Sequence, residues 1–274
     1  MKPKLDSYRD LNRSTLLRRR VDVWLPSAYQ EDAKRAFPVL YMHDGQMVFD
    51  NSHNPGGGWN VHLAIERLAK EEKITPPIVV AIPSTIERSY EYLSAKAIGY
   101  PAGKEALETS KNLRFTDENL EKSSILMAWI VETVKPFIDS HYRTLGDPAN
   151  TAMMGSSMGG LAALTMFCEY PHVFQKAACL SSHWPILGDG MISYLEDCLP
   201  SPDGRKLYFD YGSEGLDGDY APWQAKADAV LRAKGYEEGK NFVSWSFPGE
   251  GHNAGAWSAR LHIPLTFLFG TIDL

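Results

Sequence analysis

The 274-residue chain has few of the features that mark membrane-bound or disulfide-rich proteins. Its three cysteines, Cys168, Cys179 and Cys198, form no CxxC pair and no disulfide framework, which favours a reducing compartment. No uninterrupted apolar run approaches the ~18 residues of a membrane-spanning helix, and the first residues show no signal-peptide pattern. We therefore expect a cytoplasmic protein without membrane contact, although a chain trimmed of a signal peptide would look the same.

The chain also lacks an excess of basic residues. Its 34 acidic residues outnumber the 28 basic ones, and the formal net charge is -6. Phosphate binding relies on clustered lysine and arginine, so this balance argues against a nucleic-acid partner. The one basic run, Arg18 to Arg20, leads directly into an apolar stretch and predicts a solvated strand edge.

Short apolar runs alternate with helical patterns along the chain, without internal repeats or a linker. This alternation predicts one α/β domain over residues 1–274, with a mostly parallel central sheet and helices on both faces. The strand candidates are Val21–Leu25, Val39–Met42, Ile78–Ile82, Thr151–Met154, Ala177–Leu180, Leu207–Tyr211 and Phe242–Phe247; the helix candidates are Trp59–Lys70, Leu120–His141, Met158–Glu169, Ala221–Lys234 and Ala256–Phe269. The segment Ser84–Asp117 shows neither period and is expected to be irregular, with Arg88, Tyr90, Tyr92 and Tyr100 either lining a pocket or decorating the surface.

The strongest local motif is Gly155-Ser156-Ser157-Met158-Gly159, which fits G-x-S-x-G with Ser157 at its centre. A strand candidate precedes it and a helix candidate follows, as a nucleophile elbow requires. The serine of such an elbow has a strained backbone, and glycines two residues away avoid a collision. No G-K-[ST] follows, which excludes a P-loop. Ser157 is therefore the predicted nucleophile, and its neighbour Ser156 lacks the glycine flanks.

The general base is expected near the carboxyl end of the chain, since the order in this fold is serine, acid, histidine. His252 lies in a glycine-bounded loop directly after a strand candidate, whereas His262 falls in the apolar final helix and is expected to pack there. The loop after Leu207–Tyr211 offers Glu214, Asp217 and Asp219 as the acid, and spacing alone does not separate them. The loop lacks the glycine and the closing glutamate of a calcium loop, so no metal site and no cofactor are predicted.

A tetrahedral oxyanion needs two N–H donors. One is expected from Met158, directly after the nucleophile, and the other from Gln46, with Gly45 allowing the turn that aims it inward. The neighbouring His43 and Asp44 are interpreted as a hydrogen-bonded scaffold for this turn.

The chain resembles the putative-esterase family of α/β-hydrolases, which includes esterase D, enterochelin esterases, feruloyl esterases and mycolyltransferases. The resemblance rests on Arg20–Pro26, Val39–Asp50, Gly58-Trp59, Gly155–Gly160, Tyr208–Gly212 with Leu216, Asp217 and Tyr220, and Pro248–Asn253 with Trp257 and Arg260. It implies the α/β-hydrolase fold and the roles given above to Ser157, His252, Gln46 and Met158. Its Leu-Asp-x-x-Tyr pattern falls on Asp217, which makes Asp217 the favoured acid and Glu214 the second choice.

Where relatives often carry an aromatic pair, this chain has Trp184, which is expected either to flank a substrate pocket or to be buried in the core. The sequence thus predicts a serine esterase that forms an acyl-enzyme on small-molecule esters. An acyltransferase with the same triad is an alternative, as is a binding protein that has kept the fold without catalysis. The natural substrate and the oligomeric state stay open.

Overall fold

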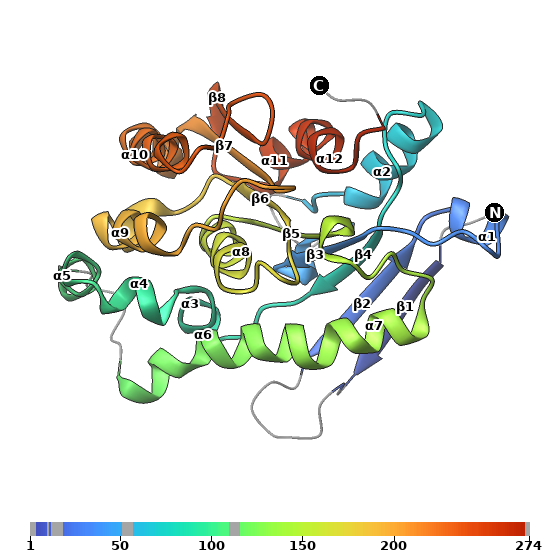
Figure 1. The fold of residues 1–274 in the computed structure, drawn as a ribbon, viewed down its shortest axis with the longest axis horizontal. Coiled ribbons are helices and arrows are strands. Elements are labelled where there is room, and N and C mark those ends of the chain that lie inside the picture. The colour runs from blue at the N-terminus through green and yellow to red at the C-terminus, as the bar shows by residue number, and fades with distance from the viewer. Residues whose placement is uncertain (1–3, 10, 12–18, 51–56, 110–115, 272–274) are drawn as a thin grey trace.

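The computed structural model describes residues 4–9, 11, 19–50, 57–109 and 116–271, and its centre is a mostly parallel sheet (Figure 1). The strands are β1 (Lys4–Arg9), β2 (Arg20–Leu25), β3 (Val39–His43), β4 (Ile78–Ile82), β5 (Thr151–Ser156), β6 (Lys176–Leu180), β7 (Lys206–Glu214) and β8 (Phe242–Gly251). Their order is β1-β2-β4-β3-β5-β6-β7-β8, with antiparallel pairing only at β1–β2 and β2–β4 among the described strands. The predicted parallel sheet is confirmed.

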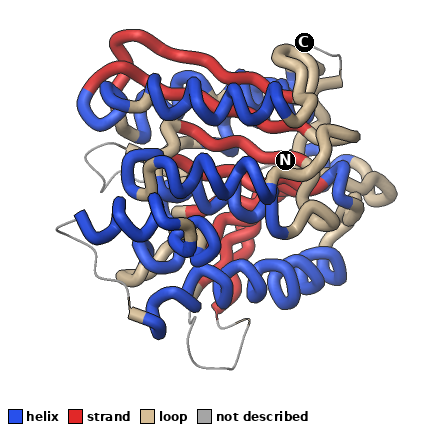
Figure 2. Tube along the Cα trace, turned by 60° about the vertical axis from the view of Figure 1, so that its left-hand side comes forward, coloured by secondary structure: helices blue, strands red, loops and turns tan. Residues whose placement is uncertain are grey.

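Helices cover both faces of this sheet, as Figure 2 shows in a rotated view. They are α1 (Ala28–Glu31), α2 (Val61–Lys70), α3 (Arg88–Tyr92), α4 (Ala95–Gly99), α5 (Pro101–Thr109), α6 (Asp117–Trp129), α7 (Lys135–His141), α8 (Met158–Glu169), α9 (Asp189–Cys198), α10 (Ala221–Ala233), α11 (Ala254–Arg260) and α12 (His262–Phe269). Within the described ranges, no helix is both long and apolar enough to cross a membrane.

The core divides into two layers, one on each face of the sheet. One layer packs β-strand side chains against α3 to α10, and the other packs them against α2, α11 and α12. The strands β3, β4 and β5 are buried throughout, because helices cover them on both faces, which explains their continuous apolar runs. Eleven of the twelve residues of α8 are buried, so the helix that follows Ser157 is enclosed by the fold.

Three features differ from the sequence-based expectations. The strand β1 was not expected, because its six residues carry no apolar run, yet it pairs with β2 along its whole length as an edge strand. The helix α9 was not predicted either. The helix expected over Ala256–Phe269 is two helices, and His262, expected to pack in the core, is exposed at the start of α12.

The segment Ser84–Asp117 is not irregular where the structure describes it, since it contains α3, α4 and α5; residues 110–115 lie outside the described ranges. Each of these helices is nine residues or shorter, too short for a clear helical period, and each buries only two residues. Tyr100, for which the sequence left a pocket and the surface equally open, donates its hydroxyl to Asp197.

The basic run also differs from expectation, because Arg19 is buried. Its guanidinium pairs with Glu91 at 2.5 Å and donates to the Pro83 carbonyl at 3.1 Å, and both side chains of the ion pair are 2% exposed. Arg20 is exposed as predicted and pairs with Asp22. Arg18 lies outside the described residues. The buried pair fastens the start of β2 to α3.

Replacing Arg19 by alanine should therefore destabilise the fold strongly. The change leaves Glu91 buried without its cation, and breaking such a pair costs about 3–5 kcal/mol of the free energy of unfolding. Arg232→Ala is the control and should cost less than ~1 kcal/mol, because both side chains of the Arg232–Glu238 ion pair are about half exposed. Urea unfolding of both variants measures the difference, and equal losses would contradict the contrast.

Candidate active site

Ser157 lies in a sharp turn between β5 and α8. Its backbone angles are φ 57° and ψ −127°, a region that costs a non-glycine residue about 1–3 kcal/mol. The conformation is held by hydrogen bonds: the Ser157 N–H donates to the Leu180 carbonyl at 2.9 Å, and the Ser157 carbonyl accepts from His183 N–H at 3.2 Å. The strand, turn and helix predicted around Ser157 are thus present.

The glycines of the motif are required by close backbone contacts. A Cβ added to Gly155 would lie 2.2 Å from the Gly159 carbonyl oxygen, and one on Gly160 would lie 2.7 Å from Ser182 Oγ. Larger side chains would therefore push α8 away from the sheet. This confirms the expectation that Gly155 avoids a collision, and Gly160 also allows α8 to pack closely.

The Asp217 carboxylate and the His252 imidazole are in direct contact. Asp217 Oδ1 lies 2.5 Å from His252 Nδ1, and Asp217 is 1% exposed. The other two carboxylates of this loop, Glu214 and Asp219, are exposed to solvent. Of the three carboxylates that spacing alone left open, Asp217 is therefore the one that contacts His252.

The Asp217 carboxylate is stabilised in its charged form. Its second oxygen accepts from Ser181 Oγ at 2.6 Å and from Gly212 N–H at 2.7 Å. Burial raises the pKa of Asp217, but the hydrogen bonds from His252, Ser181 and Gly212 outweigh it and hold the pKa below its usual value. A charged carboxylate fixes the imidazole with its other nitrogen, Nε2, available for a proton.

Ser157 and His252 share the carboxyl edge of the sheet, at the ends of β5 and β8. Among the described residues no hydrogen bond joins the two side chains; His183 and Tyr220 lie between their loops instead. His183 Nδ1 lies 2.6 Å from the Tyr220 hydroxyl, and the Tyr220 ring meets His252 edge to face, with centroids 5.9 Å apart. Burial and the nearby His252 lower the pKa of His183.

The turn after β3 carries the predicted oxyanion donor Gln46, in a short 3-10 helix over Gly45–Met47. The residue with positive φ is Asp44 (53°), not Gly45. Gly45 is needed for a different reason: a Cβ there would lie 2.5 Å from the Ile82 backbone nitrogen. Asp44 accepts two hydrogen bonds from Arg88, at 2.7 and 2.8 Å, which confirms its scaffold role. The Gln46 side chain pairs with Ser84 through two hydrogen bonds.

His43 does not form the hydrogen-bonded scaffold that we expected. It is 3% exposed, and neither ring nitrogen has a hydrogen-bond partner among the described residues. Its ring packs on Tyr92 with centroids 4.8 Å apart. Burial lowers the pKa of His43 to about 4, so the ring is neutral near pH 7 and acts as a core side chain.

Trp184, the expected substrate contact, lies in the core. It is 1% exposed, its indole N–H donates to Gln224 at 3.0 Å, and its ring packs against Phe209. This placement favours the structural role that the sequence had left open.

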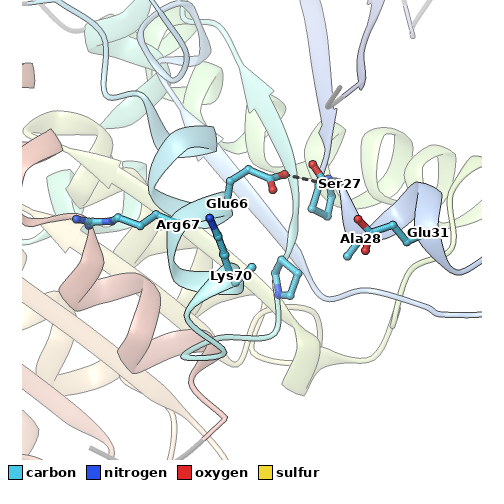
Figure 3. Close-up of a pocket in the computed structure, with 9 residues that line it drawn as sticks. Ser27, Ala28, Glu31, Glu66, Arg67 and Lys70 are labelled. Atoms are coloured by element: carbon cyan, nitrogen blue, oxygen red, sulfur yellow. Dashed lines mark hydrogen bonds between the residues drawn. The ribbon is translucent and has the colours of Figure 1, made fainter. Parts of the chain in front are cut away.

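A pocket lies near the amino end of β4 (Figure 3). Ser157 follows the carboxyl end of β5, and β4 and β5 run in the same direction, so the two lie at opposite ends of the strands. The lining of the pocket carries both signs of charge, from Glu31, Glu66, Arg67 and Lys70, and Glu66 accepts the Ser27 N–H at 2.7 Å. The candidate active site is therefore located by its chemistry and not by this concavity. Among the described residues, no group of three or more His, Cys, Asp or Glu side chains is arranged to hold a metal ion.

Sequence reasoning missed Ser181, which donates to Asp217, and Asp210, whose carbonyl accepts the Ser181 N–H. Asp210 forms a buried ion pair with Arg260, at 2.9 Å. One signal was available, since Asp210 is a charged residue inside the apolar strand candidate Leu207–Tyr211 and a buried charge needs a partner. No comparable signal marks Ser181.

Comparison with known proteins gives the class of the molecule. The family model described as "Putative esterase" matches residues 14–259. The chain therefore belongs to this esterase family, and it is an ester hydrolase. The predicted family is confirmed.

Individual relatives are more distant. The Bacillus subtilis protein described as "Uncharacterized protein YbbA" is 26% identical over 197 residues, which cover 72% of this chain and 68% of that protein. A solved "ferulic acid esterase" has a TM-score of 0.69 at 16% identity, with 98% and 99% of the two chains covered. The enterobactin esterase from Shigella flexneri has a TM-score of 0.64 at 15% identity, and this chain, covered to 98%, spans 59% of it. These likenesses establish the α/β-hydrolase fold.

The buried neutral His43 should make the fold acid-sensitive. Because its pKa falls from 6.5 in the unfolded chain to about 4 in the fold, the unfolded chain binds the proton first as the pH falls. The stabilisation is complete above pH 6.5 and is lost between pH 6.5 and 4, amounting to about 3 kcal/mol.

The measurement is the free energy of unfolding by urea at several pH values in this window. His43→Phe keeps an aromatic ring against Tyr92 and removes the titrating nitrogens. The variant should show a shallower pH dependence than the parent protein. An identical slope would exclude His43 as the source.

Proposed function

We propose that the protein is a serine carboxylic-ester hydrolase that works through an acyl-enzyme on Ser157. The observation that carries the proposal is the 2.5 Å contact between the buried Asp217 carboxylate and His252 Nδ1, at the sheet edge where Ser157 occupies a strained turn. Membership of the esterase family supports the same reaction class.

In the proposed mechanism, Ser157 Oγ attacks the ester carbonyl while His252 Nε2 takes its proton. Asp217 holds the imidazole in the tautomer with the proton on Nδ1 and stabilises the imidazolium that forms. His252 then gives the proton to the leaving alcohol, and water, activated by the same imidazole, hydrolyses the acyl-enzyme. Hydrogen bonds of this kind shorten when substrate binds, so the Ser157–His252 bond is assigned to the reacting complex.

We assign the stabilisation of the negative charge that develops on the carbonyl oxygen to the backbone N–H groups of Met158 and Gln46. Met158 is the first residue of α8, and the first four N–H groups of a helix have no acceptor within it. Gln46 follows β3, the strand next to β5, and Asp44 and Arg88 brace its turn. Fixed donors aimed at the oxyanion stabilise the transition state more than the ground state and so lower the barrier.

Ser157→Ala tests the nucleophile. The variant should lower kcat for an activated ester such as a nitrophenyl ester by about a thousandfold or more, because no acyl-enzyme can form. Ser156→Ala is the matched control, one residue away in the same motif, and should keep kcat within a few-fold. A fluorophosphonate probe should label the parent protein and not the Ser157 variant. Near-normal turnover by Ser157→Ala would rule the mechanism out.

Asp217→Asn tests the acid. The change preserves shape, removes the charge that stabilises the imidazolium and should lower kcat by about 10²- to 10⁴-fold. The same change at the exposed Asp219, and Glu214→Gln, should leave kcat nearly unchanged. Steady-state kinetics of the three variants decides the assignment, and a comparable loss in either control would overturn it.

The ester itself is found by a substrate panel of nitrophenyl, feruloyl, acetyl-sugar and thioester compounds. Hydrolysis and acyl transfer share every step up to the acyl-enzyme, so product analysis with and without an added alcohol separates them. A free acid as the main product in both cases supports the hydrolase. A predominant new ester in the presence of the alcohol favours transfer.

A further inference from the structure

The hydroxyl of Ser181 joins the acid of the candidate site to the helix that follows the base. Ser181 lies just after β6 and is fully buried. Its Oγ lies 2.6 Å from Asp217 Oδ2, 3.0 Å from Trp257 Nε1 and 3.1 Å from Arg260 Nη2. Three side chains, one from the 3-10 turn after β7 and two from α11, therefore meet on one oxygen.

The direction of each of these hydrogen bonds is determined by chemistry. A serine hydroxyl has one proton to donate and two lone pairs to accept with, whereas tryptophan and arginine side chains only donate. Trp257 and Arg260 therefore occupy both lone pairs, and the proton of Ser181 must point at Asp217. The hydroxyl is fully used and has one orientation.

We infer that Ser181 is a positioning residue that fixes the Asp217 carboxylate against His252. The inference rests on the proposed function, because it gives Ser181 a role in the same site. With one oxygen held by Ser181 and the Gly212 N–H, the Asp217 carboxylate cannot rotate about its Cβ–Cγ bond without breaking two hydrogen bonds. Its other oxygen stays directed at the imidazole.

A buried ion pair with Asp210 holds Arg260, one of the two donors to Ser181 Oγ. Arg260 donates to both oxygens of Asp210, at 2.9 and 3.0 Å, and the two residues are 4% and 0% exposed. Asp210 also accepts from the Tyr208 hydroxyl at 2.9 Å. The carboxylate orients the planar guanidinium, so that its Nη2 is directed at Ser181 as well as at Asp210.

Trp257 couples this cluster to the base. It belongs to α11, which begins two residues after His252, and its ring meets the His252 ring edge to face with centroids 5.0 Å apart. The indole therefore touches the imidazole with its ring while its N–H is held by Ser181. The two members of the Asp217–His252 pair are positioned from one atom, Ser181 Oγ.

The backbone conformation of Ser181 allows a substitution that removes the hydroxyl without straining the fold. Its φ is 42°, in the left-handed region that glycine adopts without cost, and its N–H donates to the Asp210 carbonyl at 2.7 Å. Glycine at this position would keep the backbone and relieve the strain while it removes the hydroxyl. Alanine would remove the hydroxyl and keep the strain.

The test compares Ser181→Gly and Ser181→Ala with Ser182→Ala. Ser182 is the matched control, since it is adjacent, is 1% exposed and has a hydroxyl without a hydrogen-bond partner among the described residues. Both Ser181 variants should lower kcat by about 10- to 100-fold, the value of one hydrogen bond to a charged group, with little change in KM. Ser182→Ala should retain the parent kcat.

A second readout does not depend on turnover. The proton between His252 Nδ1 and Asp217 should give a downfield proton NMR signal in the parent protein, and Ser181→Gly should shift or broaden it while Ser182→Ala leaves it in place. Trp257→Phe keeps the ring against His252 and removes one donor to Ser181, and it should move the signal less. It also provides a variant with the Ser181 hydroxyl intact if the Ser181 variants do not fold.

The outcomes separate this inference from the proposed function. Parent-like kcat and an unmoved NMR signal in folded Ser181→Gly would overturn the positioning role, even if Ser157→Ala is inactive. If only Trp257→Phe folds, an unmoved NMR signal in that variant would also overturn the positioning role. A parent protein without esterase activity that still shows a Ser181-dependent signal would refute the proposed function and support the positioning role.

Discussion

The buried carboxylate of Asp217 is the constraint on which the candidate site depends. A charged group taken out of water destabilises the fold unless every oxygen is compensated. Here the compensation comes from the Ser181 hydroxyl, the Gly212 N–H and the His252 imidazole. These donors belong to the ends of β6, β7 and β8, so satisfying one carboxylate requires three neighbouring strands to end at the right places.

Two strained serines lie at the neighbouring ends of β5 and β6, and one of them, Ser181, contacts this carboxylate. Ser157 and Ser181 both have positive φ, and the Ser157 N–H donates to the carbonyl of Leu180, the residue before Ser181. Strain of this kind persists only where the surrounding structure determines the backbone, and it is concentrated at functional sites. The parallel pairing of β5 with β6 supplies that determination, because it holds the ends of the two strands side by side.

Charged side chains hold the turn that carries Gln46, close to the start of α8. Asp44 pairs with Arg88, and Arg19 pairs with Glu91 close by, from the same short helix α3. A Cβ on Gly159 would lie 3.1 Å from Asp44 Oδ2, so this cluster packs directly against the start of α8. The ion pairs therefore connect the turn that carries Gln46, the start of α8 and α3 as one unit. The Arg19–Glu91 pair is fully buried, and removing one partner of such a pair strongly destabilises the fold.

The sequence alone determined the parallel α/β architecture, the position of the sharp turn at Ser157 and the position of His252 after the last strand, because these depend on local periodicity and on glycines at fixed spacing. Tertiary structure alone decided which of Glu214, Asp217 and Asp219 contacts His252, that Arg19 and His43 are buried, and that Ser181 hydrogen-bonds both Asp217 and Arg260. Burial and hydrogen bonding between segments depend on where distant strand ends meet. That meeting is a property of the assembled sheet, and no local pattern encodes it.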